Sequence, residues 1–308
     1  VPEVGMRCGD TGLVVAGVLD GGALCSTGPE PGDAPPAPSA PRTEASAGIQ
    51  CYGDGSSGTR VQLVYAHPAS INRLSSLKAT MRTRAAQMET IFNASAGQTG
   101  GQRHIRWATD ANCNLTVLDV TVDAAAIPST NFNALINAMV AKGNSDPNRK
   151  YLIWAETNNA NASTCSGLAT LWYDEQPTDL NWNDARTGFA RLDETCLRTV
   201  FDGRTEAHEL MHTLGGVQHG APDATPNGHC TDESDRMCYD DDGSGGVVMR
   251  STCGAGNELR FDCGNDDYFY VNAPCGAGGW VASHWNTADS HGSRCFRALA
   301  AKASASSP

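Results

Sequence analysis

Three residues within one short stretch have the types and the spacing that a zinc site requires. The segment 205–219 reads TEAHELMHTLGGVQH and contains His208, Glu209 and His212. On an α-helix, residues four apart lie on the same face, so both imidazoles can bind one Zn²⁺. Glu209 then lies beside the ligands as a general base for a zinc-bound water, whose pKa falls to about 7. The sequence therefore predicts a helix that binds zinc and activates water.

The residues after this helix indicate where the chain turns back toward the metal. Gly215 and Gly216 end the predicted helix seven residues after His208. Glycine permits the sharp turn that a backbone needs at this point to bring in a third ligand. Further along, Met237 and Tyr239 lie in the polar, cysteine-containing segment 235–239, DRMCY.

These motifs together resemble those of the metzincin metallopeptidases. The run 208–215 resembles H-E-x-x-H-x-x-G, and Met237 with Tyr239 resembles the Met-turn of that family. The resemblance covers roughly residues 51–240 and implies a secreted zinc endopeptidase with Glu209 as general base. It also implies that Met237 forms an apolar floor under the ligands and that Tyr239 contacts zinc or stabilises the oxyanion. The segments 228–239, 262–269 and 282–290 are similar to secreted actinobacterial metallopeptidases.

The third zinc ligand departs from the family pattern. Metzincins place it three residues after the glycine, where this chain has Gln218, whose amide is a poor zinc ligand. His219 is one residue late, a shift that a single insertion at the two glycines can absorb. We favour His229, because leishmanolysin-like relatives tolerate an insertion here and because His229-Cys230 resembles the archaemetzincins.

Two acidic residues are weaker alternatives for the third ligand. Asp223 is suggested by analogy with the aspartate of snapalysin. Glu233 would serve in a zinc peptidase of another clan, although Gly215 and Met237 disfavour that interpretation. The choice among these residues depends on loop conformations that the sequence does not specify.

The amino-acid composition limits the classes of binding partner and the cellular location that can be expected for this protein. With 22 Lys+Arg against 34 Asp+Glu, the net charge is −12, so nucleic acid and acidic membranes are disfavoured and a protein or peptide substrate is expected. No apolar run is long enough to span a membrane. Twelve cysteines without a CxxC pair indicate disulfides in a secreted protein. The short intervals favour the pairs Cys165/Cys196, Cys253/Cys263 and Cys275/Cys295, with Cys8 and Cys25 able to close a separate loop.

Hydrophobic periodicity predicts the elements that position the site. Strands are expected at 60–66, 104–108, 115–122, 150–155 and 167–173, with helices from Ser70 to Gly97 and over 131–142. This order predicts an α/β (α+β) fold with a mixed twisted sheet, a long backing helix and an active-site helix. By analogy with metzincins, 167–173 is expected to be the edge strand that binds an extended substrate.

The domain organisation follows from composition. Residues 28–48 contain six of the fifteen prolines, so 1–50 is an N-terminal extension with a linker. Residues 51–299 form the catalytic domain, with an upper subdomain over 51–216 and a loop-rich, disulfide-stapled lower subdomain over 217–299. Residues 300–308 form a flexible tail.

Two acidic stretches raise the question of a second cation. The segments 239–243 and 265–267 cluster hard oxygen donors in Gly-containing loops, as Ca²⁺ requires. Neither has EF-hand spacing, so a solvated acidic loop is the default interpretation and calcium binding is the alternative. The sequence is also compatible with a different function. The chain could be a disulfide-rich secreted binding or surface protein that retains a zinc site but catalyses no reaction. Glu209 between the two histidines argues against this alternative.

Overall fold

The computed structural model describes residues 22–27, 49, 51–158, 165–178, 180–198, 202–232, 234–241, 246–254, 257, 259–271, 273 and 279–289. For 22–27 only the backbone is described. None of the helices in these ranges is long and apolar enough to cross a membrane.

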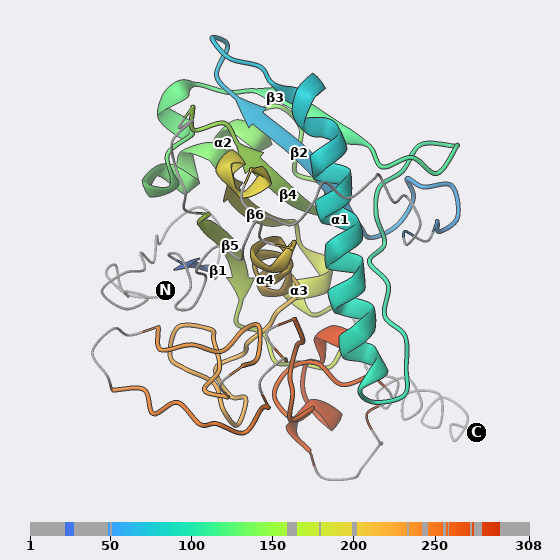
Figure 1. Cartoon of the computed structure of the whole chain (residues 1–308), viewed down its shortest axis with the longest axis vertical. Helices are drawn as coiled ribbons and strands as arrows, with labels where there is room; N and C mark the ends of the chain where they lie inside the picture. The colour runs from blue at the N-terminus through green and yellow to red at the C-terminus, as the bar shows by residue number, and fades with distance from the viewer. Residues whose placement is uncertain are drawn as a thin grey trace, which may run out of the picture.

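A mixed sheet forms the centre of the fold (Figure 1). Six strands lie in the order β1-β5-β6-β4-β2-β3. β6, β4, β2 and β3 run parallel, whereas β5 pairs antiparallel with both β6 and β1. The bounds are β1 (Gly22–Thr27), β2 (Arg60–His67), β3 (Val117–Thr121), β4 (Arg149–Ala155), β5 (Gly167–Trp172) and β6 (Gly188–Asp193). The predicted α/β fold class with a mixed sheet is confirmed.

Helices cover both faces of this sheet. On one face, α1 (Leu74–Gly97) and α4 (Arg204–Thr213) pack against Leu63 and Trp154. On the other face, α2 (Phe132–Ala141) packs against Val64 and Ile153. Because the central strands are buried on both faces, they consist of nearly continuous apolar residues, which is why sequence periodicity finds them. The short helix α3 (Trp182–Ala185) follows β5 and precedes β6 along the chain.

Several predicted bounds shift because tertiary contacts compete with local signals. The long helix begins at Leu74, not at Ser70, because the preceding residue is held in place. The Arg73 amide donates to the Tyr65 hydroxyl, and the Arg73 guanidinium pairs with Glu156. The predicted strand 104–108 forms only isolated bridges, such as Val61 with Trp107. β6 was not predicted, and β5 is not an edge strand because β1 pairs with its outer side.

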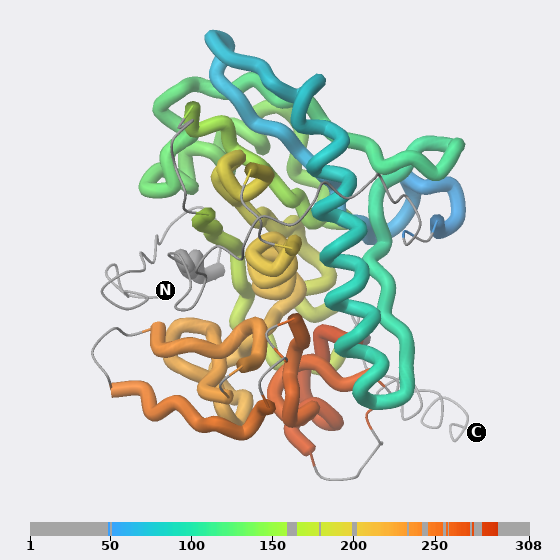
Figure 2. The backbone as a smooth tube through the Cα atoms, viewed as in Figure 1, coloured from blue at the N-terminus to red at the C-terminus, as the bar shows by residue number. Residues whose placement is uncertain are grey.

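Loops predominate after α4, as expected. In the view of Figure 2, the described residues of this region, in orange and red, lie below the sheet. Their only described helical turns are η4 (Trp280–Ala282) and η5 (Thr287–Asp289). Four disulfides are described: Cys51–Cys113, Cys165–Cys196, Cys230–Cys238 and Cys253–Cys263. Two of the expected pairs are therefore present, whereas those involving Cys8, Cys25, Cys275 and Cys295 lie outside the described side chains.

Candidate metal centre

The helix that carries the motif is fixed at its start by a close approach to α1. Gly203 precedes α4 with a φ of 76°, in the left-handed region that favours glycine. A Cβ at this position would lie 2.9 Å from Gln87 Cβ and 3.1 Å from the Arg84 carbonyl oxygen. Every residue from Thr205 to Thr213 is buried. Glycine at 203 therefore allows α4 to pack directly on α1.

The two helical imidazoles face each other with their nitrogens oriented by backbone carbonyls. His208 Nδ1 lies 3.0 Å from the Arg236 carbonyl oxygen, and His212 Nδ1 lies 2.8 Å from that of Gly216. A carbonyl only accepts hydrogen bonds, so both Nδ1 atoms carry the proton and both Nε2 atoms present lone pairs. The two Nε2 atoms are 3.0 Å apart. Two lone pairs this close need a cation or a proton between them.

His229 completes a group of three imidazoles. Its ring centroid lies 5.2 Å from that of His208 and 4.9 Å from that of His212. Its Nδ1 is 2.7 Å from Asp241 Oδ2, so the carboxylate fixes the tautomer and leaves Nε2 as an acceptor. The three ligand nitrogens lie within 4.8 Å of one another, and all three residues are fully buried.

This arrangement fits a metal ion better than a shared proton. Burial lowers the pKa of His208 to about 3, and burial together with His208 and His229 lowers the pKa of His212 well below its usual value. The imidazoles of His208 and His212 are therefore neutral and retain their lone pairs at neutral pH. Two nitrogens bound to one tetrahedral zinc lie about 3.3 Å apart, close to the spacing seen here. His208, His212 and His229 thus form a buried group that can bind a metal.

The other residues considered as third ligands have different surroundings. The exposed His219 ring packs against Tyr173, with centroids 3.5 Å apart. Asp223 pairs with Arg250. Gln218 donates its amide to the carbonyls of Trp172 and Gly215, so it anchors the turn after α4. Glu233 lies outside the described residues.

Glu209 lies against the first residue of β5. It is fully buried, and a Cβ on Gly167 would come within 2.5 Å of the Glu209 carboxyl carbon. Any larger residue at 167 would displace this carboxylate. The start of β5 and the candidate general base are therefore in direct contact.

The residues on either side of Met237 contact the imidazoles, because the Arg236 carbonyl bonds to His208 and the Tyr239 hydroxyl to His229. Met237 is fully buried, and its carbonyl accepts a hydrogen bond from the Cys230 amide. The Tyr239 hydroxyl lies 3.0 Å from His229 Nε2, with ring centroids 4.3 Å apart. Sequence reasoning singled out Met237 and Tyr239 but missed the Arg236 carbonyl that orients His208.

Asp241 was also missed as a partner of the site. From the sequence it belongs to an acidic stretch, 239–243, for which a solvated loop is the default interpretation and calcium binding the alternative. Asp241 instead turns inward, is 5% exposed and bonds to His229 and Thr225. Its position just after Tyr239 was the only available signal, because the contact with His229 depends on the fold of the loop.

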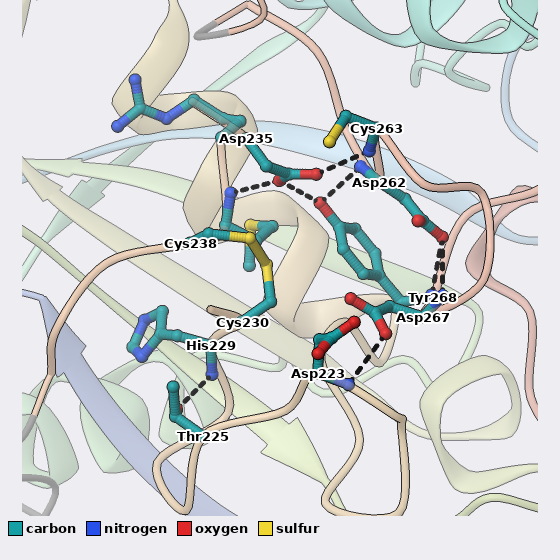
Figure 3. Close-up of a disulfide and its surroundings, with 12 residues drawn as sticks. Asp223, Thr225, His229, Cys230, Asp235, Cys238, Asp262, Cys263, Asp267 and Tyr268 are labelled. Atoms are coloured by element: carbon teal, nitrogen blue, oxygen red, sulfur yellow. Dashed lines mark hydrogen bonds between the residues drawn. A yellow bond between two sulfur atoms is a disulfide. The ribbon is translucent and has the colours of Figure 1, made fainter. Parts of the chain in front are cut away.

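A buried polar network keeps this segment in position (Figure 3). Asp235 accepts hydrogen bonds from the amides of Met237 and Cys263 and from the Tyr268 hydroxyl, at 2.6–3.0 Å. Tyr268 also accepts a hydrogen bond from the Asp262 amide. Burial raises the pKa of Asp235 to about 7 despite its three donors. The network links the Met237 segment to the loops after Cys253.

This raised pKa predicts a stability difference that depends on pH. A folded pKa above the ordinary value of 3.8 gives a stability contribution that is complete below pH 3.8 and is lost as pH rises through about 7. Asp235→Asn does not titrate and also places its amide against the Cys263 N–H. We expect the melting temperature of the wild type to exceed that of the variant by more at pH 5 than at pH 8. The change corresponds to roughly 1–4 kcal/mol. A difference that stays the same at pH 5 and pH 8 would mean that the folded carboxylate is ionised throughout this range.

Comparison with known proteins adds no assignment. Neither the known protein-family models nor the curated protein sequences contain a match to this chain. Its function is therefore argued from the geometry of the site.

Proposed function

We propose that this protein is a secreted zinc-dependent endopeptidase of the metzincin type. The observation that carries the proposal is the group of three buried imidazoles, His208, His212 and His229, with Glu209 next to the first of them on the same helix. Three imidazole nitrogen ligands suit zinc and leave a fourth position for water or substrate. The four disulfides support a secreted location because such bonds are typical of extracellular proteins.

Each residue then has a defined role in peptide hydrolysis. Bound zinc would supply a Lewis acid that acidifies water and polarises a carbonyl. Glu209 takes the proton of the attacking water and passes it to the leaving amine. The Tyr239 hydroxyl, beside the imidazoles, donates a hydrogen bond to the oxyanion. Asp241 and the two carbonyls hold the imidazoles in the tautomer that exposes Nε2.

The strand next to Glu209 is the natural position for a substrate backbone. An extended peptide can bind by adding a strand to a sheet edge. The outer side of β5 begins at Gly167, in contact with Glu209. β1 pairs with this side, from Gly22 opposite Trp172 to Thr27 opposite Gly167. We infer that β1 and an extended substrate compete for the same strand.

This competition predicts that weakening β1 raises activity. Ala23→Pro combined with Leu24→Pro removes two successive N–H groups, at least one of which faces β5 in an antiparallel pair. We expect kcat/KM for a long peptide to rise several-fold, mainly through a lower KM. Ala37→Pro, in a segment already rich in proline, is the control and should leave both constants unchanged. Unchanged kinetics in the double variant would show that substrate does not use this side of β5.

The direct test of the proposed function compares the wild type with Glu209→Gln. Zinc content is measured by mass spectrometry, and cleavage of an unfolded protein such as casein is followed by gel electrophoresis. One zinc per chain in both proteins, with cleavage by the wild type alone, is the expected result. No zinc in the folded, disulfide-bonded wild type would overturn the proposal and favour a binding protein.

A further inference from the structure

A cavity of about 530 Å³ lies at the carboxyl ends of the parallel strands β2, β4 and β6. Its lining includes Pro68, just after β2, Glu156, just after β4, and Asp193, the last residue of β6. Pockets that bind small molecules have volumes of roughly 300–1,000 Å³. The cavity therefore has the size of a small-molecule site.

The cavity also lies where the winding of the sheet changes direction. β2 pairs in parallel with β3 on one side and with β4 on the other. α1, between β2 and β3 in the chain, covers one face of the sheet, and α2, between β3 and β4, covers the other. The loops that leave β2 and β4 therefore diverge, and in such sheets ligands bind in the crevice between them. Ile71 from the first loop and Thr157 from the second line this cavity.

Arg191 on β6 contributes a buried guanidinium to the cavity wall. The residue is fully buried and lines the cavity. Its Nη2 donates to the Ile127 carbonyl at 2.8 Å and to Asp193 Oδ1 at 2.7 Å. Both partners also line the cavity, so they fix the guanidinium at its wall.

Two nitrogens of this guanidinium have N–H groups without an acceptor. Nε and Nη1 of Arg191 have no hydrogen-bond partner within the described part of the chain. Buried donors without an acceptor are unfavourable, and more so when the group is charged. These donors are an observation independent of the cavity, and they indicate a ligand that supplies an acceptor.

The carboxylates that line the cavity, in contrast, each have a cation as partner. Glu156 pairs with Arg73, and Asp193 pairs with Arg191. The lining therefore requires a hydrogen-bond acceptor and not a further cation. Because the two carboxylates stay close to any bound anion, a doubly charged ligand is repelled more than a singly charged one.

We propose that this cavity binds a small molecule with a single carboxylate, which accepts hydrogen bonds from Arg191. Guanidinium and carboxylate form charge-assisted hydrogen bonds, which are stronger than those to neutral acceptors. The rest of the lining suits a partly apolar body. Ile71 and Ile127 supply apolar surface, and Ser129 and Thr130 supply hydroxyl groups.

The proposed site is separate from the imidazole group. Successive side chains of a strand point to opposite faces of a sheet. On β6, Leu192 belongs to the same core cluster as Leu210 of α4, whereas Phe189 packs with Ile153 in the cluster that contains α2. Arg191 lies on the face of Phe189, opposite α4. The inference does not depend on peptidase activity.

The experiment titrates the full-length, disulfide-bonded protein with N-acetyl-leucine by calorimetry. This probe combines one carboxylate with an apolar side chain and an amide. We expect one site per chain with a Kd on the order of 10⁻³ M, as for other ligands of this size. N-acetyl-leucinamide has the same body without the charge and should bind about tenfold more weakly or less. Inorganic phosphate should also bind more weakly.

Two variants and a control locate the binding. Thr130→Trp places a large ring at the exposed rim and should abolish binding without disturbing Arg191. Arg191→Lys keeps a positive charge beside Asp193 but removes the unpartnered donors, so it should weaken binding about tenfold. Asn137→Trp, on the exposed side of α2 and outside the lining, should bind like the wild type.

Four results would overturn the proposal. The first is no binding to the folded wild type at about ten times the expected Kd. The second is equal binding by Thr130→Trp, which would place the probe elsewhere. The others are equal binding of the amide and tighter binding of phosphate, because each would contradict recognition of a single carboxylate.

Discussion

Glu209→Gln is expected to retain one zinc per chain and to lose peptide hydrolysis by about 10²–10⁴-fold in kcat, the usual contribution of a general base. Gln has nearly the same shape as Glu, so it fills the space beside Gly167 without creating a cavity. It cannot accept the proton of the attacking water. Zinc content, circular dichroism and kcat on a quenched-fluorescence peptide measure the three relevant quantities.

Glu206→Gln is the matched control for this experiment. Glu206 is on the same helix and equally buried, and its carboxylate lies 3.7 Å from Arg84 Nε. Its loss should lower the melting temperature, because a buried charge loses its partner, while kcat at 25 °C stays near the wild-type value. If both variants lost activity in proportion to their stability, Glu209 would have only a structural role.

The parts of the fold that the sequence predicts are those determined by local pattern. The strand 150–155 and the helix 131–142 have apolar periodicity that matches their burial on both faces of the sheet, so both were placed within one or two residues. β6 was missed. Its pairing with β4 and β5 depends on partners far away in the sequence, and its own residues, GFARLD, carry only a short pattern.

In the candidate site, too, local sequence pattern predicts some residues, whereas contacts between distant segments determine the others. His208, Glu209 and His212 follow from helical geometry alone, since their relative positions depend only on the spacing. The sequence left His229, His219 and Asp223 as alternatives because loop conformation decides among them. That conformation depends on the Cys230–Cys238 disulfide and on the Asp235–Tyr268 hydrogen bond. Asp241 could not be predicted as the partner of His229 for the same reason.

His229→Ala should abolish retention of zinc, whereas His219→Ala should retain it. Removing His229 leaves two nitrogen ligands, too few to hold zinc against dialysis. It also leaves the buried Asp241 carboxylate without its hydrogen-bond partner.

Asp241→Asn should have an intermediate effect, with zinc affinity reduced by 10–100-fold, because it removes only the group that orients the imidazole. Zinc content after dialysis against a weak chelator measures all three variants. Full zinc in His229→Ala together with loss in His219→Ala would transfer the third position to His219. That outcome would require the loop after Gly216 to bring the exposed His219 ring away from Tyr173 and into the metal centre.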